Sequence, residues 1–173
     1  MTRNDEWLRF RRRDFLRSAS AISVGGLAAL AGCSNGGSDN NGDGTYVPQE
    51  PNYQGWFENV SNYKGTVEAR GQSEFRITVG AKGSNGFYYY GPPAVAVSPD
   101  TTVTWEWNGK GGTHNVVSTS GAFTSGQLVD DKGHTFTTEL ANPGVYRYFC
   151  SPHQSLGMKG VVFVSLGQPG EGM

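Results

Sequence analysis

Short runs of apolar and β-branched residues, separated by glycine, asparagine, aspartate and proline, fill the chain from about Tyr53 to Ser165. Apolar positions alternate with polar ones in several of these runs, and helical periodicity is hard to find. Nine runs are candidate strands: residues 65–69, 74–79, 87–90, 94–97, 101–107, 114–118, 135–140, 145–150 and 160–164. Short strands divided by turn residues are typical of a sandwich or a barrel, so we predict one all-β domain.

The alternation also predicts which side chains share a face of the sheet. Trp105 and Trp107 lie two residues apart in one candidate strand, and we expect both in the core. In the candidate strand 145–150, Tyr146, Tyr148 and Cys150 follow one another at intervals of two residues. The thiol is therefore expected on an internal face of the domain, together with the two tyrosines.

The first 33 residues have the features of an export signal. Residues 11–17 contain twin arginines followed by Phe-Leu and another arginine, which resembles a twin-arginine signal. The small and apolar run 19–31 is too short to be a comfortable membrane span. It ends in Leu-Ala-Gly-Cys, which resembles a lipobox, so we predict a signal peptide over residues 1–33 with lipidation at Cys33. An ordinary signal peptide with an incidental cysteine is the alternative.

The rest of the chain divides into three parts by composition. Residues 34–52 are rich in Ser, Asn, Gly and Asp, with two prolines near their end. Such a stretch has too little apolar content to fold, so we predict a flexible linker with a root-mean-square reach on the order of 24 Å. Residues 53–167 form the predicted domain, and residues 168–173 are a C-terminal tail.

Charge and cysteine count narrow the possible functions. The chain has a net charge of −1, and the +3 of residues 1–33 leaves −4 on residues 34–173. A mildly acidic mature protein argues against nucleic acid as a partner. Cys33 and Cys150 are the only cysteines, so the domain has no internal disulfide. Metal ligation explains an unpaired exported cysteine, because a coordinated thiolate is deprotonated and shielded from oxidation.

The segment from Cys150 to Met158 carries the most specific chemistry. It offers a thiolate, the His153 imidazole and a thioether within nine residues, and His114 supplies a second imidazole. A thiolate with imidazoles and a weak axial thioether is the ligand set of a blue-copper electron-transfer centre. The third histidine, His134, follows a polar turn, and we expect it to be solvated rather than a ligand.

Two neighbours of these residues are candidates for tuning the centre. The amide of Asn115, beside His114, is expected to hydrogen-bond across to the cysteine loop and to pin the two ligand segments together. Pro152 has no backbone N–H, so the loop has one fewer donor to offer the Cys150 sulfur. Fewer donors leave the thiolate more electron-rich.

These segments together resemble the halocyanins, small blue-copper proteins of the plastocyanin-like cupredoxin group. The resemblance rests on residues 53–57, 79–81, 92–95, 103–107, 114–117, 148–153 and 157–160. It implies a cupredoxin-like Greek-key β-sandwich that binds one type 1 copper ion. It also implies that His114, Cys150 and His153 are the equatorial copper ligands and that Met158 is the axial ligand.

The leading hypothesis is a membrane-anchored carrier that shuttles single electrons between redox partners of an electron-transport chain. We expect a monomer that is exported, lipid-anchored to the outer face of the cell membrane, and served by membrane redox proteins as donor and acceptor. An enzyme is disfavoured, because a further metal centre needs several histidines and only His134 remains. Two alternatives stay open: a non-redox copper or zinc storage lipoprotein, and the electron-entry subunit of a copper enzyme.

Overall fold

A computed structural model describes residues 45–167 of the chain. The predicted signal peptide 1–33 with Cys33, most of the predicted linker and the tail 168–173 lie outside the described residues. Within residues 45–167, no helix has the length and apolar character that crossing a bilayer requires.

Strands dominate the described part of the chain. It contains nine strands and one short 3₁₀ helix, η1. Their bounds are β1 Val67–Glu68, β2 Glu74–Gly83, β3 Gly86–Gly91, β4 Ala94–Val97, β5 Thr102–Trp107, β6 Val117–Ser118, β7 Thr135–Glu139, β8 Gly144–Phe149, η1 Gln154–Leu156 and β9 Lys159–Val164. Each candidate strand of the sequence overlaps one of these strands, so the all-β prediction is confirmed.

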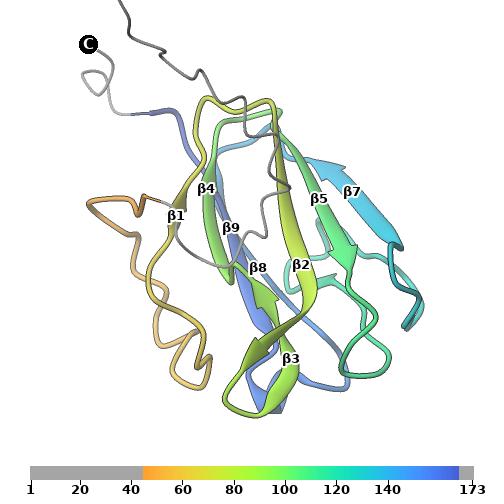
Figure 1. The fold of residues 1–173 in the computed structure, drawn as a ribbon. Helices are drawn as coiled ribbons and strands as arrows, with labels where there is room; N and C mark the ends of the chain where they lie inside the picture. Colours follow the sequence, from red (N-terminus) through yellow and green to blue (C-terminus); the bar gives the residue numbers. More distant parts are fainter. Residues whose placement is uncertain (1–44, 168–173) are drawn as a thin grey trace, which may run out of the picture. The chain divides into compact units, whose positions relative to one another are not determined.

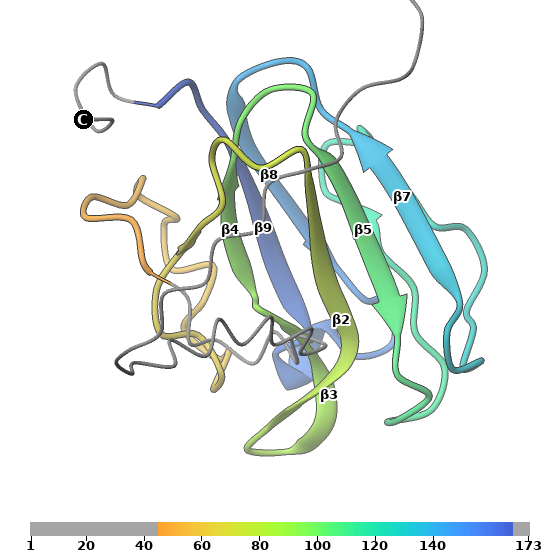
Figure 2. The same cartoon turned by 45° about the horizontal axis from the view of Figure 1, so that its top comes forward.

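The strands form two sheets, as Figures 1 and 2 show. One sheet has the order β1-β4-β9-β8-β6, and the other has the order β3-β2-β5-β7. β2 and β3 form an antiparallel hairpin, whereas β4 pairs in parallel with β9 and β2 pairs in parallel with β5. Parallel neighbours need long crossover connections, so the chain passes repeatedly from one sheet to the other.

The core lies on the inward faces of both sheets. Trp105 and Trp107 are 0% and 1% exposed, as the alternation along β5 predicts. The ring of Trp105 lies 5.3 Å from that of Phe123 and 5.2 Å from that of Tyr148, measured between centroids. Tyr148 and Cys150 are also fully buried, so the strand before the cysteine presents its predicted internal face.

Three strands differ from their predicted bounds by three or more residues, and the first of them, β1, keeps only Val67–Glu68 of the predicted strand 65–69. Only Val117–Ser118 of the predicted strand 114–118 form β6, because His114 instead makes an isolated bridge to Val129. β2 continues four residues beyond its predicted end, through register shifts opposite β3. The glycines and the lysine of this extension are poor strand formers, so no strand pattern is visible there in the sequence.

The last residues of the predicted linker are attached to the domain. Val47 is 7% exposed, and its N–H donates to the Thr66 carbonyl at 2.9 Å. The Glu68 N–H donates to the Thr45 carbonyl at 2.7 Å, and Tyr46 bridges to Val67 in β1. Residues 45–47 therefore pair alongside β1 and extend the ordered part of the chain upstream of residue 53.

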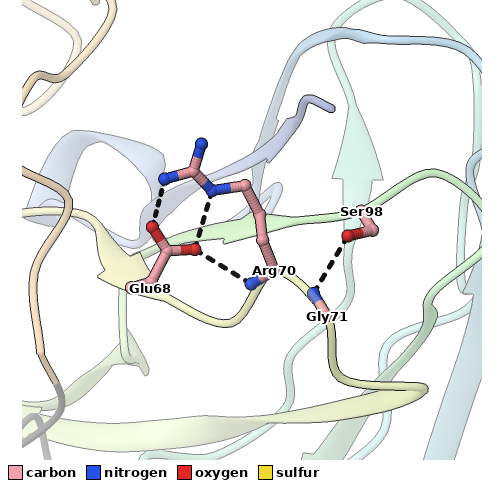
Figure 3. Close-up of polar contacts among 4 residues, drawn as sticks. All are labelled: Glu68, Arg70, Gly71 and Ser98. Carbon is pink, nitrogen blue, oxygen red and sulfur yellow. Dashed lines mark hydrogen bonds and ion pairs between the residues drawn. The ribbon is translucent and has the colours of Figure 1, made fainter. Parts of the chain in front are cut away.

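Polar contacts fix the chain where β1 ends, as Figure 3 shows. The Arg70 guanidinium forms an ion pair with the Glu68 carboxylate, and its Nε donates to Oε1 at 2.8 Å. The next residue, Gly71, donates its N–H to the Ser98 hydroxyl at 3.0 Å. The Gly71 hydrogen bond joins the β1–β2 connection to the turn between β4 and β5.

Candidate metal centre

The central strands of the five-stranded sheet bring the candidate ligands together. β8 and β9 are antiparallel neighbours, so their connection, residues 150–158, lies at one end of the sheet. This connection contains Cys150, His153 and Met158. β6 pairs with β8 in the register Val117 to Phe149, and continuing that register places His114 beside the connection.

Three ligand atoms meet at this end of the sheet. Nδ1 of His114 lies 3.1 Å from Nδ1 of His153, and the Cys150 Sγ lies 3.7 Å and 3.4 Å from these two nitrogens. A tetrahedral metal with bonds of about 2.0 Å to nitrogen and 2.3 Å to sulfur holds its ligand atoms roughly 3.3–3.6 Å apart. The cluster therefore fits around one metal ion without rearrangement.

The candidate ligands differ in their exposure to solvent. His114 is 1% exposed, and Cys150 and Met158 are 0% exposed. Met158 belongs to the same hydrophobic cluster as Cys150. His153 is half-buried, and its ring lies 4.7 Å from that of Tyr88. Three of the four candidate ligands are therefore buried, and His153 is the one that solvent reaches.

His134 does not join the cluster. Within the described residues, the cluster of potential ligands contains only His114, Cys150 and His153. The His134 ring instead packs edge-on against Trp107, with centroids 4.9 Å apart. It is half-buried beside a core tryptophan, so the structure modifies the expectation of a solvated histidine without making it a ligand.

The tautomer of His114 follows from one backbone contact. Its Nε2 lies 2.9 Å from the Lys110 carbonyl, which can only accept, so Nε2 carries the proton and Nδ1 offers a lone pair to the cluster. Gly111 makes this approach possible: a Cβ there would lie 2.4 Å from the Phe87 carbonyl oxygen and 3.0 Å from Nε2. Neither Lys110 nor Gly111 was a candidate from the sequence, although the glycine pair before His114 was a visible signal.

Asn115 joins the two segments that carry the candidate ligands. Its Oδ1 accepts from the Ser151 N–H at 2.9 Å, and its Nδ2 donates to the Ser151 hydroxyl at 3.2 Å and to the Gly126 carbonyl at 3.4 Å. The Tyr90 hydroxyl donates to the backbone carbonyl of Asn115 at 2.6 Å. The Asn115 side chain therefore links the segment that carries His114 to the cysteine loop.

Backbone hydrogen bonds close the cysteine loop on itself. The His153 N–H donates to the Cys150 carbonyl, the Met158 N–H to the His153 carbonyl, and the Cys150 N–H to the Met158 carbonyl, at 3.0–3.1 Å. Pro152 is exposed on the outer side of the loop. The backbones of Cys150, His153 and Met158 are thus hydrogen-bonded to one another in a closed set of three bonds.

Burial sets the protonation of the three side chains. Burial lowers the pKa of His114, with the Lys110 carbonyl acting in the opposite direction, and burial also lowers the pKa of His153. Burial raises the pKa of the Cys150 thiol. Hydrogen bonds from the backbone of Asn115 and His153 lower this pKa and partly offset the effect of burial. Both imidazoles are therefore ready to bind a metal, whereas the thiol needs a cation to displace its proton.

The fold and the cluster define a class of copper-binding protein with two sheets and a Cys-His₂ centre. Residues 77–165 match the family model described as copper binding proteins, plastocyanin/azurin family. This match covers slightly more than half of the chain, and the chain belongs to this family. Copper is the metal that the family binds, and the cluster is a compatible ligand set.

Curated relatives agree with the family model. The chain is 44% identical over 105 residues to a halocyanin from Natronomonas pharaonis, a match that covers 59% of this chain and 63% of that protein. It is 38% identical over 95 residues to a chloroplastic plastocyanin from Physcomitrium patens, covering 50% and 54% of the two chains. The chain thus spans less than two thirds of both relatives. A plastocyanin from Scenedesmus fuscus is 31% identical over 97 residues and is covered to 98% of its length, with 51% of this chain.

Solved structures include a purple cupredoxin from Nitrosopumilus maritimus. It matches with a TM-score of 0.43 at 28% identity and covers 52% of this chain and 98% of that one.

Proposed function

We propose that this protein is a single-electron carrier whose copper ion is held by His114, Cys150, His153 and Met158. The observation that carries the proposal is the meeting of two imidazole nitrogens and one thiol sulfur within 3.7 Å of one another. Copper in such a site supplies one-electron exchange between Cu(I) and Cu(II). Methionine favours copper over zinc, because a thioether is a poor zinc ligand.

The arrangement of the side chains suits electron transfer better than catalysis. The Lys110 carbonyl holds the His114 ring, and backbone hydrogen bonds hold the cysteine loop. The candidate ligands therefore need little movement when the charge of the centre changes. The half-buried ring of His153 gives the centre one point of contact with the surface. Two of the three histidines are used in this cluster, which leaves no ligand set for a substrate-binding metal within the described residues.

The proposed cellular role follows from the sequence motifs at the N-terminus. We place the mature protein on the outer face of the cell membrane, exported through the twin-arginine signal and anchored to lipid at Cys33. A dual acyl anchor holds a protein stably at a membrane surface. Its donor and acceptor are then membrane redox proteins, and it acts as a monomer. Replacement of Cys33 by serine tests the anchor, because the variant should leave the membrane fraction while an anchored wild type stays in it.

Visible absorption and electron paramagnetic resonance of the copper-loaded mature protein test the carrier function. We expect an intense visible band that disappears on adding ascorbate, together with a reversible one-electron wave in voltammetry. A colourless copper adduct without such a wave would instead support a storage site or a zinc site.

Variants assign the ligands individually. Cys150→Ala should abolish the colour and keep the β fold, whereas His134→Phe, which alters the histidine outside the cluster and keeps a ring against Trp107, should stay coloured. Met158→Leu should raise the reduction potential, because losing a weak donor disfavours Cu(II). An unchanged potential would show that Met158 is not a ligand.

A further inference from the structure

Residues 53–63 form a turn-rich segment upstream of the part that the family model matches, residues 77–165. Tyr53, Phe57 and Val60 are buried in a second hydrophobic cluster, together with Tyr89 and Val161. The rings of the segment also contact one another, with Phe57 stacked on Tyr63 at 4.0 Å between centroids. The segment is therefore a packed part of the domain and has a defined position against β9.

This segment contacts the cysteine loop directly on its outer side. The Asn59 side chain donates from Nδ2 to the Ser155 carbonyl at 3.0 Å. The backbone carbonyl of Asn59 lies against Gly157, where an added Cβ would be 2.2 Å from its oxygen. The segment thus contacts Gly157, the loop residue directly before Met158.

A second contact lies just after Met158. The indole Nε1 of Trp56 donates to the Gly160 carbonyl at 3.1 Å. The Lys159 ammonium lies over the Trp56 ring, 5.1 Å from its centroid. Contacts from Asn59 and Trp56 therefore flank Met158 on both sides along the chain.

The same segment also reaches the strand beside the other ligand segment. The Asn62 side chain donates to the Tyr90 carbonyl at 2.8 Å. The Tyr90 hydroxyl in turn donates to the carbonyl of Asn115, the neighbour of His114. One short segment thus connects to both halves of the candidate metal centre.

The middle of the loop, residues 151–156, needs support from outside because all of it except the half-buried His153 is exposed. The helix η1 buries none of its residues and has no capping side chain. It ends at Gly157, whose backbone has φ +99°, a conformation that favours glycine. Without the Asn59 amide, the Ser155 carbonyl would have only solvent as a partner among the contacts described.

We propose that residues 53–63 act as a brace that sets the position of Met158 relative to Cys150 and His153, with Asn59 and Trp56 as positioning residues. This proposal rests on the proposed ligand role of Met158. The brace fixes the loop in the protein before copper binds, so the metal enters a preformed site. It consequently tunes the centre from a part of the chain that supplies no ligand.

Asn59→Asp tests the proposal against a matched control, Asn52→Asp. The change at Asn59 replaces the donor to Ser155 by a carboxylate that repels its carbonyl. The change at Asn52 adds the same charge to a neighbouring exposed position, but the Asn52 Oδ1 only accepts from the Gln54 N–H, at 2.8 Å, and a carboxylate does so equally well. Both side chains are exposed, so neither variant endangers folding.

Hydrogen exchange of the copper-free protein is the first measurement. In Asn59→Asp we expect the amides of Gly157 and Met158 to exchange about two- to tenfold faster than in the control, the effect of losing one ordinary hydrogen bond. Exchange rates equal to those of the control would overturn the brace. This measurement is independent of copper, so it stands even when the protein turns out not to be a blue-copper carrier.

The spectrum of the copper-loaded protein is the second measurement. We expect Asn59→Asp to shift the relative intensities of the visible bands and the copper hyperfine splitting, and Asn52→Asp to leave both unchanged. Trp56→Phe, which keeps the ring and loses the donor to Gly160, should shift them in the same direction. Faster exchange with an unaltered spectrum in Asn59→Asp would show that the segment stabilises the loop without positioning Met158, and would overturn the proposal.

Discussion

Asn115 offers a quantitative test of how the two ligand segments are held together. Asn115→Ala removes two hydrogen bonds of good length to Ser151, at 2.9 and 3.2 Å, and a longer one to Gly126, at 3.4 Å. Each ordinary hydrogen bond contributes about 1 kcal/mol, and the long bond contributes little. Asn115 is only 7% exposed, whereas Ser151 is exposed and its N–H regains water in the variant. We therefore expect a loss of about 2 kcal/mol in the free energy of unfolding.

Urea denaturation of the copper-free protein measures this loss, because bound metal would add its own binding free energy. For a domain of this size, a loss of about 2 kcal/mol corresponds to a melting temperature lower by roughly 6–8 °C. Ser151→Ala is the matched variant, since it removes the hydroxyl partner of Asn115 and keeps the backbone N–H. We expect it to lose less than about 1 kcal/mol. An Asn115→Ala protein no less stable than Ser151→Ala would refute the assignment of Asn115 as the tie between the segments.

Two further predictions concern the ends of β1 and the cysteine loop. Hydrogen bonds from Arg70 lower the pKa of Glu68 below the ordinary value of a glutamate. The ion pair therefore stabilises the fold above that ordinary value and loses this effect as pH falls through the folded-state pKa. Glu68→Gln should thus be less stable than wild type by up to about 1 kcal/mol at pH 7 and equally stable near pH 2. Urea denaturation at the two pH values measures this difference. A difference in stability that does not change with pH would contradict the prediction. Gly157→Ala should lose about 2 kcal/mol or more, from its positive φ and the clash with the Asn59 carbonyl, and a thermal melt like that of wild type would disprove the close approach.

The strands of this protein were predictable wherever their side chains alternate. The Trp105 and Trp107 pair illustrates this, because a two-residue period on a half-buried strand determines which face is buried. The prediction was wrong over most of residues 114–118, where only Val117–Ser118 are a strand. The apolar pair after His114 gave a strand pattern there, but the backbone around His114 pairs with Val129 through a single bridge. A bridge depends on where distant segments meet, and the local sequence does not contain that information.

The candidate ligands were predictable for a different reason. Thiol, imidazole and thioether groups are chemically distinctive, and three of the four lie within one loop of the sequence. The structure then brings His114 to them through the pairing of β6 with β8. His134 is the same residue type in the same domain, but the register of β7 places it against Trp107.

Apart from the Asn115 amide, the supporting contacts were not predictable, because many of them use backbone atoms that every residue possesses. The Lys110 carbonyl fixes the proton on His114, and a lysine side chain gives no hint of that role. Its only trace in the sequence is Gly111, which leaves room for the Phe87 carbonyl and the imidazole to approach. Asn59 likewise meets the cysteine loop through Ser155, 96 residues further along the chain. Ligand identity therefore resides in side chains that a sequence displays, whereas ligand position depends on long-range backbone contacts that only the folded chain creates.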